Sequence, residues 1–291
     1  MVTEPDRTLD HFGEGVSAAS LSALLELSLA WRSYKEAIVL VGGWAPFFLL
    51  ETYKAAGDPY SHVGSIDIDV AVNPKLVDDD AYASIESIIQ GRGYELRLDR
   101  VGNPIAFSYA KTTVDSKGRE LRVVVDFLGP EAGGRGKEHR TQVVQDDFRL
   151  RKARGVDVVF AHCFPYRLDG RLPNGARAST DILVADLVGC LTTKGMAIGD
   201  RYKEKDAYDV YSVIAHSKSG PREVAAEVAP FIEDPLVKEG INHILDAFKA
   251  IDANGPAWVA DFLGATGLGR ERIIADSYSE VARFADELGR T

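Results

Sequence analysis

The segment from Gly64 to Val72 constrains the fold more than any other stretch of the chain. It reads Gly-Ser-Ile-Asp-Ile-Asp-Val-Ala-Val, which predicts a β-strand over about 65–72. Successive side chains of a strand point to opposite faces, so Asp67 and Asp69 share one face while their apolar neighbours point into a core. Two carboxylates in such positions repel each other unless a cation lies between them. Mg²⁺ favours oxygen ligands of this kind and usually shares them with substrate phosphates. The segment therefore indicates a core strand that handles phosphoryl groups through a metal.

The rest of the chain divides into two kinds of sequence. Before about residue 175, short apolar runs alternate with amphipathic stretches, which predicts an α/β domain with a mixed sheet. From Thr180 onward, the apolar spacing is almost wholly helical. We therefore expect an α+β protein with an α/β domain over 1–175 and a C-terminal helical domain over 176–291. Strands are predicted at about 37–41, 65–72, 94–98, 104–114, 119–128, 156–160 and 164–168, and helices at about 16–35, 44–56, 78–90, 180–197, 203–217, 221–231, 236–252, 256–264 and 270–288.

Composition and charge exclude several classes of protein. The chain of 291 residues has a formal net charge of −10, which argues against coating nucleic acid by general electrostatics but not against a local basic groove. No apolar run reaches the ~18 residues that a membrane helix needs. The first residues lack the charged and apolar regions of a signal peptide. The 2 cysteines favour a reducing compartment. The 6 histidines are scattered and form no cluster with the cysteines, which argues against a zinc site. We expect a cytoplasmic protein without a membrane partner.

Two more features of the first half fit phosphoryl chemistry. Gly42-Gly43 ends a predicted strand and precedes a predicted helix. Glycine lets the backbone approach a phosphate and a helix N-terminus offers unpaired N–H groups, although plain turn chemistry is the alternative. Asp126 ends the apolar run Val123–Val125, from which it could join the aspartate pair in a two-metal site or simply cap the next turn. For the pair itself, a solvated strand face is the alternative.

The second half offers a lysine and an acidic helix start. Lys194 lies within the predicted helix Asp181–Ala197, among leucines and valines. It either compensates the dipole at the helix end or reaches a triphosphate as a point charge. In the segment Arg201–Tyr211, Asp206 and Asp209 share one helix face at i, i+3 spacing. Acidic residues in a first turn suit any helix, so this segment is ambiguous when taken alone.

Taken together, these motifs resemble the DNA polymerase β-like nucleotidyltransferase superfamily, and within it the AbiEii/MenT group of toxin nucleotidyltransferases. The family pattern is a strand ending in Gly-Gly, a helix, a Ser/Thr-x-Asp-hydrophobic-Asp strand, a lysine on a later helix, and a Lys-Asp-x-x-Asp-hydrophobic-Tyr helix. The matching residues lie within about 38–214 and are Gly42-Gly43, Ser65-Ile66-Asp67-Ile68-Asp69, Lys194, and Lys205-Asp206-Ala207-Tyr208-Asp209-Val210-Tyr211.

The resemblance implies a polymerase β-like α/β domain followed by helices. It implies Mg²⁺-dependent transfer of NMP from an NTP to an acceptor. Asp67 and Asp69 would bind Mg²⁺, with Asp126 as the third metal carboxylate, a position that varies within the group. The residues implied to face the triphosphate are Gly42, Gly43 and Ser65.

For the later helices, the resemblance implies that Lys194 contacts phosphate and that Asp206 positions the acceptor or acts as a base near it. The chain departs from the family at one point. Members often carry an arginine just ahead of the Ser/Thr-x-Asp triplet, whereas Tyr60–Gly64 contains none. Arg201 or the basic segment 135–154 could substitute for that cation.

The resemblance also suggests partners. The acceptor would be a tRNA 3′ end or a protein hydroxyl, and a cognate antitoxin would bind the chain. The basic residues of 135–154 motivate the RNA acceptor, although a solvated loop explains them equally well: Arg135, Lys137, Arg140, Arg149, Arg151, Lys152 and Arg154.

Three alternatives remain from the sequence. One is transfer to a small hydroxylated compound such as an aminoglycoside, because net acidity suits a cationic substrate. Another is a catalytically degenerate member that binds nucleotide or a partner without turnover, which the missing arginine motivates. The last is an unrelated α+β domain in which the acidic residues coincide by chance.

Overall fold

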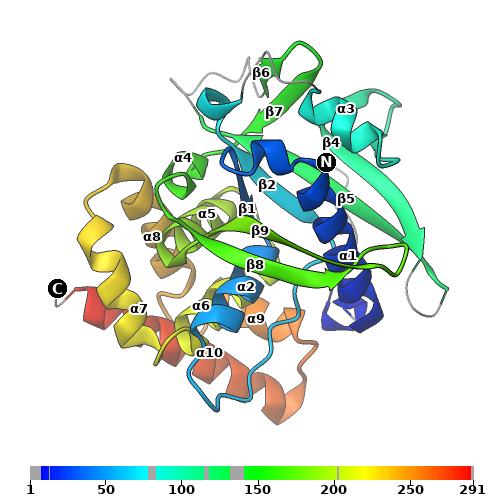
Figure 1. Cartoon of the computed structure of the whole chain (residues 1–291). Helices are drawn as coiled ribbons and strands as arrows, with labels where there is room; N and C mark the ends of the chain where they lie inside the picture. Colours follow the sequence, from blue (N-terminus) through cyan, green and yellow to red (C-terminus); the bar gives the residue numbers. More distant parts are fainter. Residues whose placement is uncertain are drawn as a thin grey trace. The chain divides into compact units, whose positions relative to one another are not determined.

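The computed structural model describes residues 8–12, 14–77, 83–114, 118–131, 141–201 and 203–289 (Figure 1). The chain forms two compact units, and neither is continuous in sequence. The first, here called the sheet unit, comprises Gly13–Trp44 and Ser65–Ala185. The second, the helical unit, comprises Met1–Phe12, Ala45–Gly64 and Asp186–Thr291. The chain therefore leaves the sheet unit after its first strand and re-enters it at the predicted carboxylate strand.

In the sheet unit, the described residues form one nine-stranded mixed sheet, and the mixed pairing agrees with the prediction. The strand order is β3-β4-β5-β2-β1-β9-β8, with β7 pairing β5 and β6 pairing β7. The pairs β1–β9, β2–β5 and β5–β7 are parallel and the remaining pairs are antiparallel. The strands are β1 Ile38–Val41, β2 Ile68–Val72, β3 Glu95–Leu98, β4 Pro104–Val114, β5 Glu120–Gly129, β6 Thr141–Gln145, β7 Phe148–Lys152, β8 Cys163–Arg171 and β9 Arg177–Ala185.

One face of this sheet is the apolar core of the unit. Helix α1 (Glu14–Ala30) packs across it against β5, β8 and β9 (Figure 1). The ring of Trp31, just after α1, meets the edge of Phe127 on β5 at a centroid distance of 6.0 Å. Because side chains alternate along β5, Asp126 points to the opposite face from Phe127. The remaining helical segments of the unit are α3 Ile85–Gln90, α4 Val156–Val159, η2 Arg32–Tyr34 and η3 Pro74–Leu76.

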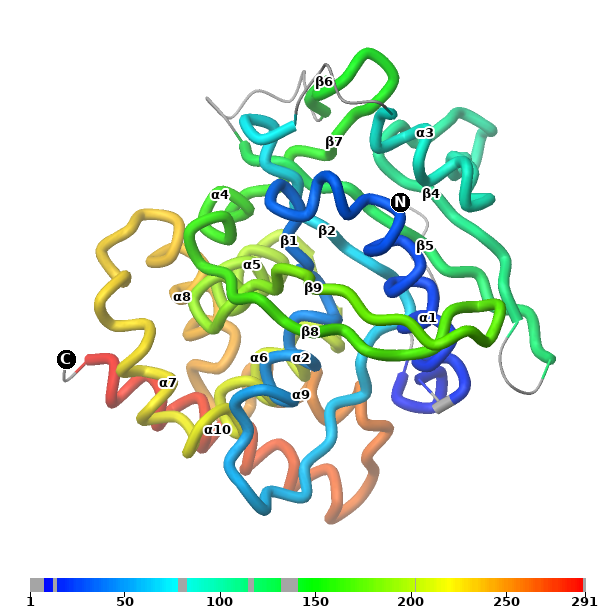
Figure 2. Tube along the Cα trace, in the orientation of Figure 1, coloured from blue at the N-terminus to red at the C-terminus, as the bar shows by residue number. Residues whose placement is uncertain are grey.

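The helical unit is built from helices that the sequence largely predicts (Figure 2). Its long elements are α2 Trp44–Tyr53, which starts at the last residue of the sheet unit, α5 Leu187–Asp200, α6 Glu204–His216, α7 Pro221–Val228, α8 Pro235–Ala247, α9 Asn254–Phe262 and α10 Gly267–Leu288. Two 3₁₀ turns, η1 Leu9–Phe12 and η4 Ala229–Phe231, also belong to it. Helix α5 packs against α6 and α8, while α10 packs against α7 and α9.

The contact between α5 and α8 is unusually close because it is made by glycines. A Cβ atom on Gly195 of α5 would lie 1.9 Å from the carbonyl oxygen of Gly240 on α8. A Cβ atom on Gly240 would in turn lie 2.6 Å from the carbonyl oxygen of Thr192. The two backbones therefore touch, which holds α5 in a fixed position within the unit.

The helix predicted over 180–197 is wrong at its beginning. Residues up to Ala185 belong to strand β9, which pairs with both β1 and β8. Helix α5 begins only at Leu187, and the carboxylate of Asp186 caps it by accepting a hydrogen bond from the Gly189 N–H at 3.0 Å. A run rich in leucine and valine suits either structure, and two neighbouring strands decide it here. The division into domains 1–175 and 176–291 therefore differs from the observed units, since it would separate β8 from β9.

Two other predicted elements also differ from the structure. Residues 156–160, predicted as a strand, contain the short helix α4, which follows Gly155 at φ +82°. The segment 129–155 contains none of the predicted strands, yet its described part contains β6 and β7. Along β7, buried Phe148 and Leu150 alternate with exposed Arg149 and Arg151, a strand pattern that the positive charge obscures.

Some predictions fall outside the described residues: Arg135, Lys137 and Arg140, and the start of the 78–90 helix. In the part of the chain that the structure describes, no helix combines the length and the apolar character needed to cross a bilayer. Cys163 and Cys190 are both free thiols.

Candidate functional site

The two predicted metal-binding aspartates lie at the start of β2. Asp69 is within the strand and Asp67 lies in the bend just before it, and both are half-buried. Ile68 and Val70 are fully buried, so the predicted alternation of carboxylates and core side chains is observed. The approach to β2 is anchored to α1, because the Ser20 hydroxyl donates a 2.7 Å hydrogen bond to the Ile66 carbonyl. The chain therefore enters the strand in a fixed register.

Asp126 lies beside Asp69. Strands β2 and β5 are parallel, and their register pairs these two residues directly. Paired positions of neighbouring strands point to the same face, so the carboxylates share one side of the sheet. Burial and the nearby charges of Asp69 and Asp67 raise the pKa of Asp126 to about 6, although Ser108 and Arg97 act in the opposite direction. The Asp126 carboxylate is thus crowded by like charge.

The first predicted glycine packs against the Asp69 carboxylate. Gly42 follows β1 directly and has φ +64°, a conformation that favours glycine. A Cβ atom at this position would lie 2.0 Å from Asp69 Oδ2. Gly42 is therefore required for two independent reasons, its backbone conformation and the space that Asp69 occupies. Gly43 is buried just before α2 begins at Trp44, and Ser65 is buried ahead of Asp67.

Sequence reasoning missed two partners of Asp126, namely Arg97 on β3 and Ser108 on β4. Ser108 pairs with Asp126 in the β4–β5 register and donates its hydroxyl proton to Asp126 Oδ1. Arg97 donates to the Ser108 hydroxyl at 3.2 Å and lies 4.0 Å from the same carboxylate oxygen. A signal was present in the sequence. If the predicted strands 104–114 and 119–128 are paired as a hairpin, position 108 falls within one residue of the position opposite Asp126.

The carboxylates of Asp67 and Asp69 are the kind of ligands used by a metal ion that takes only part of its coordination from the protein. Among the described residues, no group of three or more histidine, cysteine, aspartate or glutamate side chains is arranged to hold a metal. A preformed metal cage of protein ligands is therefore not observed in that part of the chain. Mg²⁺ rarely uses such a cage, since it is commonly bound through one or two carboxylates together with water and substrate phosphates. Half-buried Asp67 and Asp69 offer that kind of partial site.

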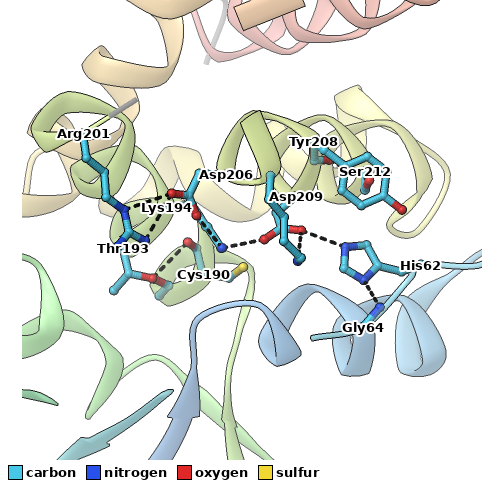
Figure 3. A network of polar contacts seen from close by, with 12 residues as sticks. His62, Gly64, Cys190, Thr193, Lys194, Arg201, Asp206, Tyr208, Asp209 and Ser212 are labelled. Atoms are coloured by element: carbon cyan, nitrogen blue, oxygen red, sulfur yellow. Dashed lines mark hydrogen bonds and ion pairs between the residues drawn. The ribbon is translucent and has the colours of Figure 1, made fainter. Parts of the chain in front are cut away.

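The predicted lysine lies in a separate buried cluster within the helical unit (Figure 3). Lys194 is in the middle of α5, which rules out a role as a dipole-compensating residue at the helix end. Its ammonium group donates to Asp206 Oδ1 at 2.8 Å and to Asp209 Oδ2 at 2.5 Å, both on α6. An ammonium has three donors, and no described residue accepts the third. Lys194 therefore joins α5 to α6 and keeps one N–H available.

The cluster balances most of its own charge. Arg201 pairs with Asp206 Oδ2 at 3.2 Å, and Lys205 donates to Asp209 Oδ1 at 2.8 Å. Burial disfavours the charged form of Lys194, but the two neighbouring carboxylates outweigh it and raise its pKa. Burial likewise acts against the charged forms of Asp206 and Asp209, and the surrounding cations nevertheless lower the pKa of both carboxylates. Lys194, Asp206 and Asp209 are consequently charged near neutral pH.

His62 completes the cluster as a neutral residue. The Gly64 N–H donates to His62 Nδ1 at 3.1 Å, so Nδ1 carries no proton. The other nitrogen, Nε2, then donates to Asp209 Oδ1 at 3.0 Å. Burial lowers the pKa of His62 to about 4, despite the opposing influence of Asp209. The imidazole thereby ties the end of the 45–64 segment to helix α6, as Figure 3 shows.

Comparison with known proteins finds no matching family model, no matching curated protein and no matching solved structure. The resemblance therefore depends on the sequence motifs alone.

The predicted site residues fall into two groups. Gly42, Gly43, Ser65, Asp67, Asp69 and Asp126 belong to the sheet unit, whereas Lys194 and Asp206 belong to the helical unit. Of the cations expected to replace the missing arginine, Arg201 is engaged with Asp206, and Arg154 pairs with Glu131 at 3.2 Å. Arg97, which the sequence did not single out, lies 4.0 Å from Asp126 Oδ1 in the sheet unit.

Proposed function

We propose that this chain is a Mg²⁺-dependent nucleotidyltransferase that moves NMP from an NTP to an acceptor hydroxyl. A bond forms between the acceptor oxygen and the α-phosphorus, and the bond from the α-phosphorus to the oxygen that bridges it to the β-phosphorus breaks to release pyrophosphate. The acceptor hydroxyl gives up its proton to solvent. The observation that carries the proposal is the paired register of Asp69 and Asp126, with Gly42 against the Asp69 carboxylate. A strand carboxylate pressed against a glycine turn suits a site where phosphate and cation approach the backbone.

The residues of the sheet unit would divide the work. Asp67 and Asp69 would hold Mg²⁺, which would neutralise charge on the triphosphate and on the leaving pyrophosphate. Gly42-Gly43 and Ser65 would bind the triphosphate through backbone N–H groups and a hydroxyl. Asp126, the third carboxylate, would act beside Asp69. Catalysis would come mainly from positioning and from charge neutralisation.

The roles of Lys194 and Asp206 stay predictions. The available N–H of the Lys194 ammonium supports a contact with a phosphate oxygen. Asp206 would act near the acceptor as a positioning group or a base. The lowered pKa of Asp206 supports positioning, because its carboxylate is held charged by Lys194 and Arg201 and is a weak base.

The proposed acceptor is a tRNA 3′ end or a protein hydroxyl, with an antitoxin protein as the cognate partner. Exposed Arg149 and Arg151 on β7 favour the RNA acceptor, because neither forms an ion pair with any described residue. Two arginines on one strand face can contact successive phosphates. The net charge of −10 favours a cationic small-molecule acceptor instead, so both classes belong in the test.

The test is transfer of label from α-³²P-NTPs by the purified chain, with Mg²⁺ and with total RNA, cell protein or an aminoglycoside as acceptor. We expect label on RNA with the wild type and a loss of at least ~100-fold with Asp69→Asn, which keeps the shape of the side chain but weakens cation binding. Asp169→Asn, at an exposed position on β8, is the matched control and should transfer normally.

The outcomes separate the acceptors. Label on protein or on the aminoglycoside would support nucleotidyl transfer but would show that RNA is not the acceptor. Equal transfer by wild type and Asp69→Asn, or no transfer to any acceptor with any of the four NTPs, would reject the proposed function.

A further inference from the structure

We infer that Arg97 and Ser108 are positioning residues that fix the Asp126 carboxylate beside Asp69. This inference rests on the proposed function for its catalytic consequence, but its structural content can be tested without it. The arrangement is a relay of hydrogen bonds across three neighbouring strands of the sheet: Arg97 on β3, Ser108 on β4 and Asp126 on β5.

The relay fixes which group donates and which accepts at each of its two hydrogen bonds. A serine hydroxyl has one proton to donate, and Ser108 gives it to Asp126 Oδ1. Its lone pairs then receive the N–H of Arg97 at 3.2 Å. Ser108 is 1% exposed, so water has little access to replace either partner. The serine therefore transmits the position of the Arg97 guanidinium to the carboxylate.

The contacts are concentrated on one carboxylate oxygen. Both Ser108 and Arg97 approach Asp126 Oδ1, while no described residue donates a hydrogen bond to Oδ2. Asp126 is thereby held by one oxygen and presents the other. Such one-sided anchoring suits a group that must meet a ligand in a defined orientation, because a 1 Å displacement of a reacting group slows a reaction strongly.

The relay also explains how this chain tolerates Asp126 next to Asp69. Two carboxylates at paired positions of adjacent strands repel each other. Without a fixed partner, Asp126 would relieve the repulsion by rotating away from Asp69. The hydrogen bond from Ser108 and the guanidinium at 4.0 Å oppose that rotation. Arg97 thus supplies a positive charge to the group of carboxylates, in a chain that lacks the expected arginine before Ser65.

The first experiment compares crystal structures of the metal-free wild type, Ser108→Ala and Arg97→Met. We expect the Asp126 carboxylate to leave its wild-type rotamer or lose order in Ser108→Ala, and to shift less in Arg97→Met, with the strands unchanged. An Asp126 carboxylate that keeps its position in both variants would overturn the inference, whatever the enzyme does.

The second experiment measures transfer kinetics of the same variants under the conditions that test the proposed function. A positioning role predicts that kcat falls about 10-fold or more in Ser108→Ala and Arg97→Met while the KM for NTP changes little. Arg97→Lys, which keeps a charged donor, should recover most of kcat. Arg100→Met, an exposed residue of the turn after β3, is the matched control and should behave as wild type.

The two experiments fail in different ways. An inert wild type would reject the proposed function while the crystal structures still decide whether the relay positions Asp126. A wild type that is active, with kcat unchanged in both Ser108→Ala and Arg97→Met, would reject the relay while the proposed function stands.

Discussion

At the scale of single residues, two groups of charged side chains differ in how their charge is compensated. In the helical unit, Lys194 and the neighbouring cations lower the pKa of Asp206 and Asp209. The negative charge of those carboxylates is therefore already compensated by protein groups. In the sheet unit, Arg97 lies 4.0 Å from Asp126, yet the pKa of Asp126 is still raised to about 6 by burial and by Asp69. The carboxylates of the sheet are therefore the group to which a divalent cation would add most.

The first prediction concerns Asp126→Asn in metal-free buffer. A raised pKa means that the folded chain binds a proton more tightly than the unfolded chain, so wild-type stability falls as pH rises from about 4 to about 6. Asparagine removes the charge and can still accept from Ser108. We expect the variant to be about 1–3 kcal/mol more stable than wild type at pH 7, with the difference vanishing below pH 4. Urea unfolding with EDTA at both pH values measures this.

Asp169→Asn, an exposed control, should change stability little at either pH. A variant Asp126→Asn that unfolds more easily than wild type at pH 7 would show that Ser108 and Arg97 already compensate the carboxylate fully.

The second prediction concerns His62, which is buried in its neutral form with a pKa of about 4. As pH falls from about 6.5 to about 4, His62 binds a proton in the unfolded chain but stays neutral in the folded chain. The free energy of unfolding therefore falls over this pH range. We expect the loss to reach about 3 kcal/mol and to be much smaller in His62→Gln, which can still donate to Asp209. Urea unfolding between pH 4.5 and 7 measures the slope.

The matched control is His11→Gln, which removes an exposed histidine. If the wild type and His62→Gln lost stability in parallel over this range, the buried neutral imidazole would be ruled out as the cause.

At the scale of elements, the spacing of apolar residues predicted most strands and helices. It failed where the same residues suit either a strand or a helix. The alternation around Asp67 and Asp69 gave β2, because a period of two is distinctive. The run before Leu187 suits a strand or a helix, and its pairing with β1 and β8 decides it. Ser108 and Arg97 were missed for a related reason. Their role depends on strand register, which requires knowing which strands are neighbours.

The third prediction concerns the glycine contact between α5 and α8. In Gly240→Ala, the new methyl group would meet the Thr192 carbonyl oxygen at 2.6 Å, so the helices must separate. We expect a loss of about 3 kcal/mol or more in the free energy of unfolding, because backbone atoms cannot move aside as a flexible side chain does. Denaturant unfolding measures it, with Gly195→Ala expected to cost at least as much.

Gly269→Ala on α10 is the matched control, since nothing lies within 4 Å of its added Cβ. It should be neutral or slightly stabilising, by about 0.5–1 kcal/mol, because alanine favours a helix over glycine. Equal effects of Gly240→Ala and Gly269→Ala would contradict the close contact.

At the scale of the whole molecule, the chain is interleaved between two units. It leaves the sheet unit after Trp44, contributes Ala45–Gly64 to the helical unit, and returns at Ser65. Sequence composition predicts one boundary near residue 175, because a boundary read from composition assumes that each unit is continuous. The structure gives His62 and Gly64 a role that composition does not indicate. They hold the last residues of the inserted segment to α6, immediately before the carboxylate strand begins.

The most direct test of the metal site proposed here is anomalous diffraction from crystals of the wild type and Asp69→Asn soaked with Mn²⁺ and a non-hydrolysable NTP analogue. Mn²⁺ takes the same oxygen ligands as Mg²⁺ and scatters anomalously. We predict a manganese peak in contact with the carboxylates of Asp67 and Asp69, beside the analogue's phosphates, and no peak in Asp69→Asn. An analogue bound elsewhere, with both wild-type carboxylates contacting only water, would contradict the account.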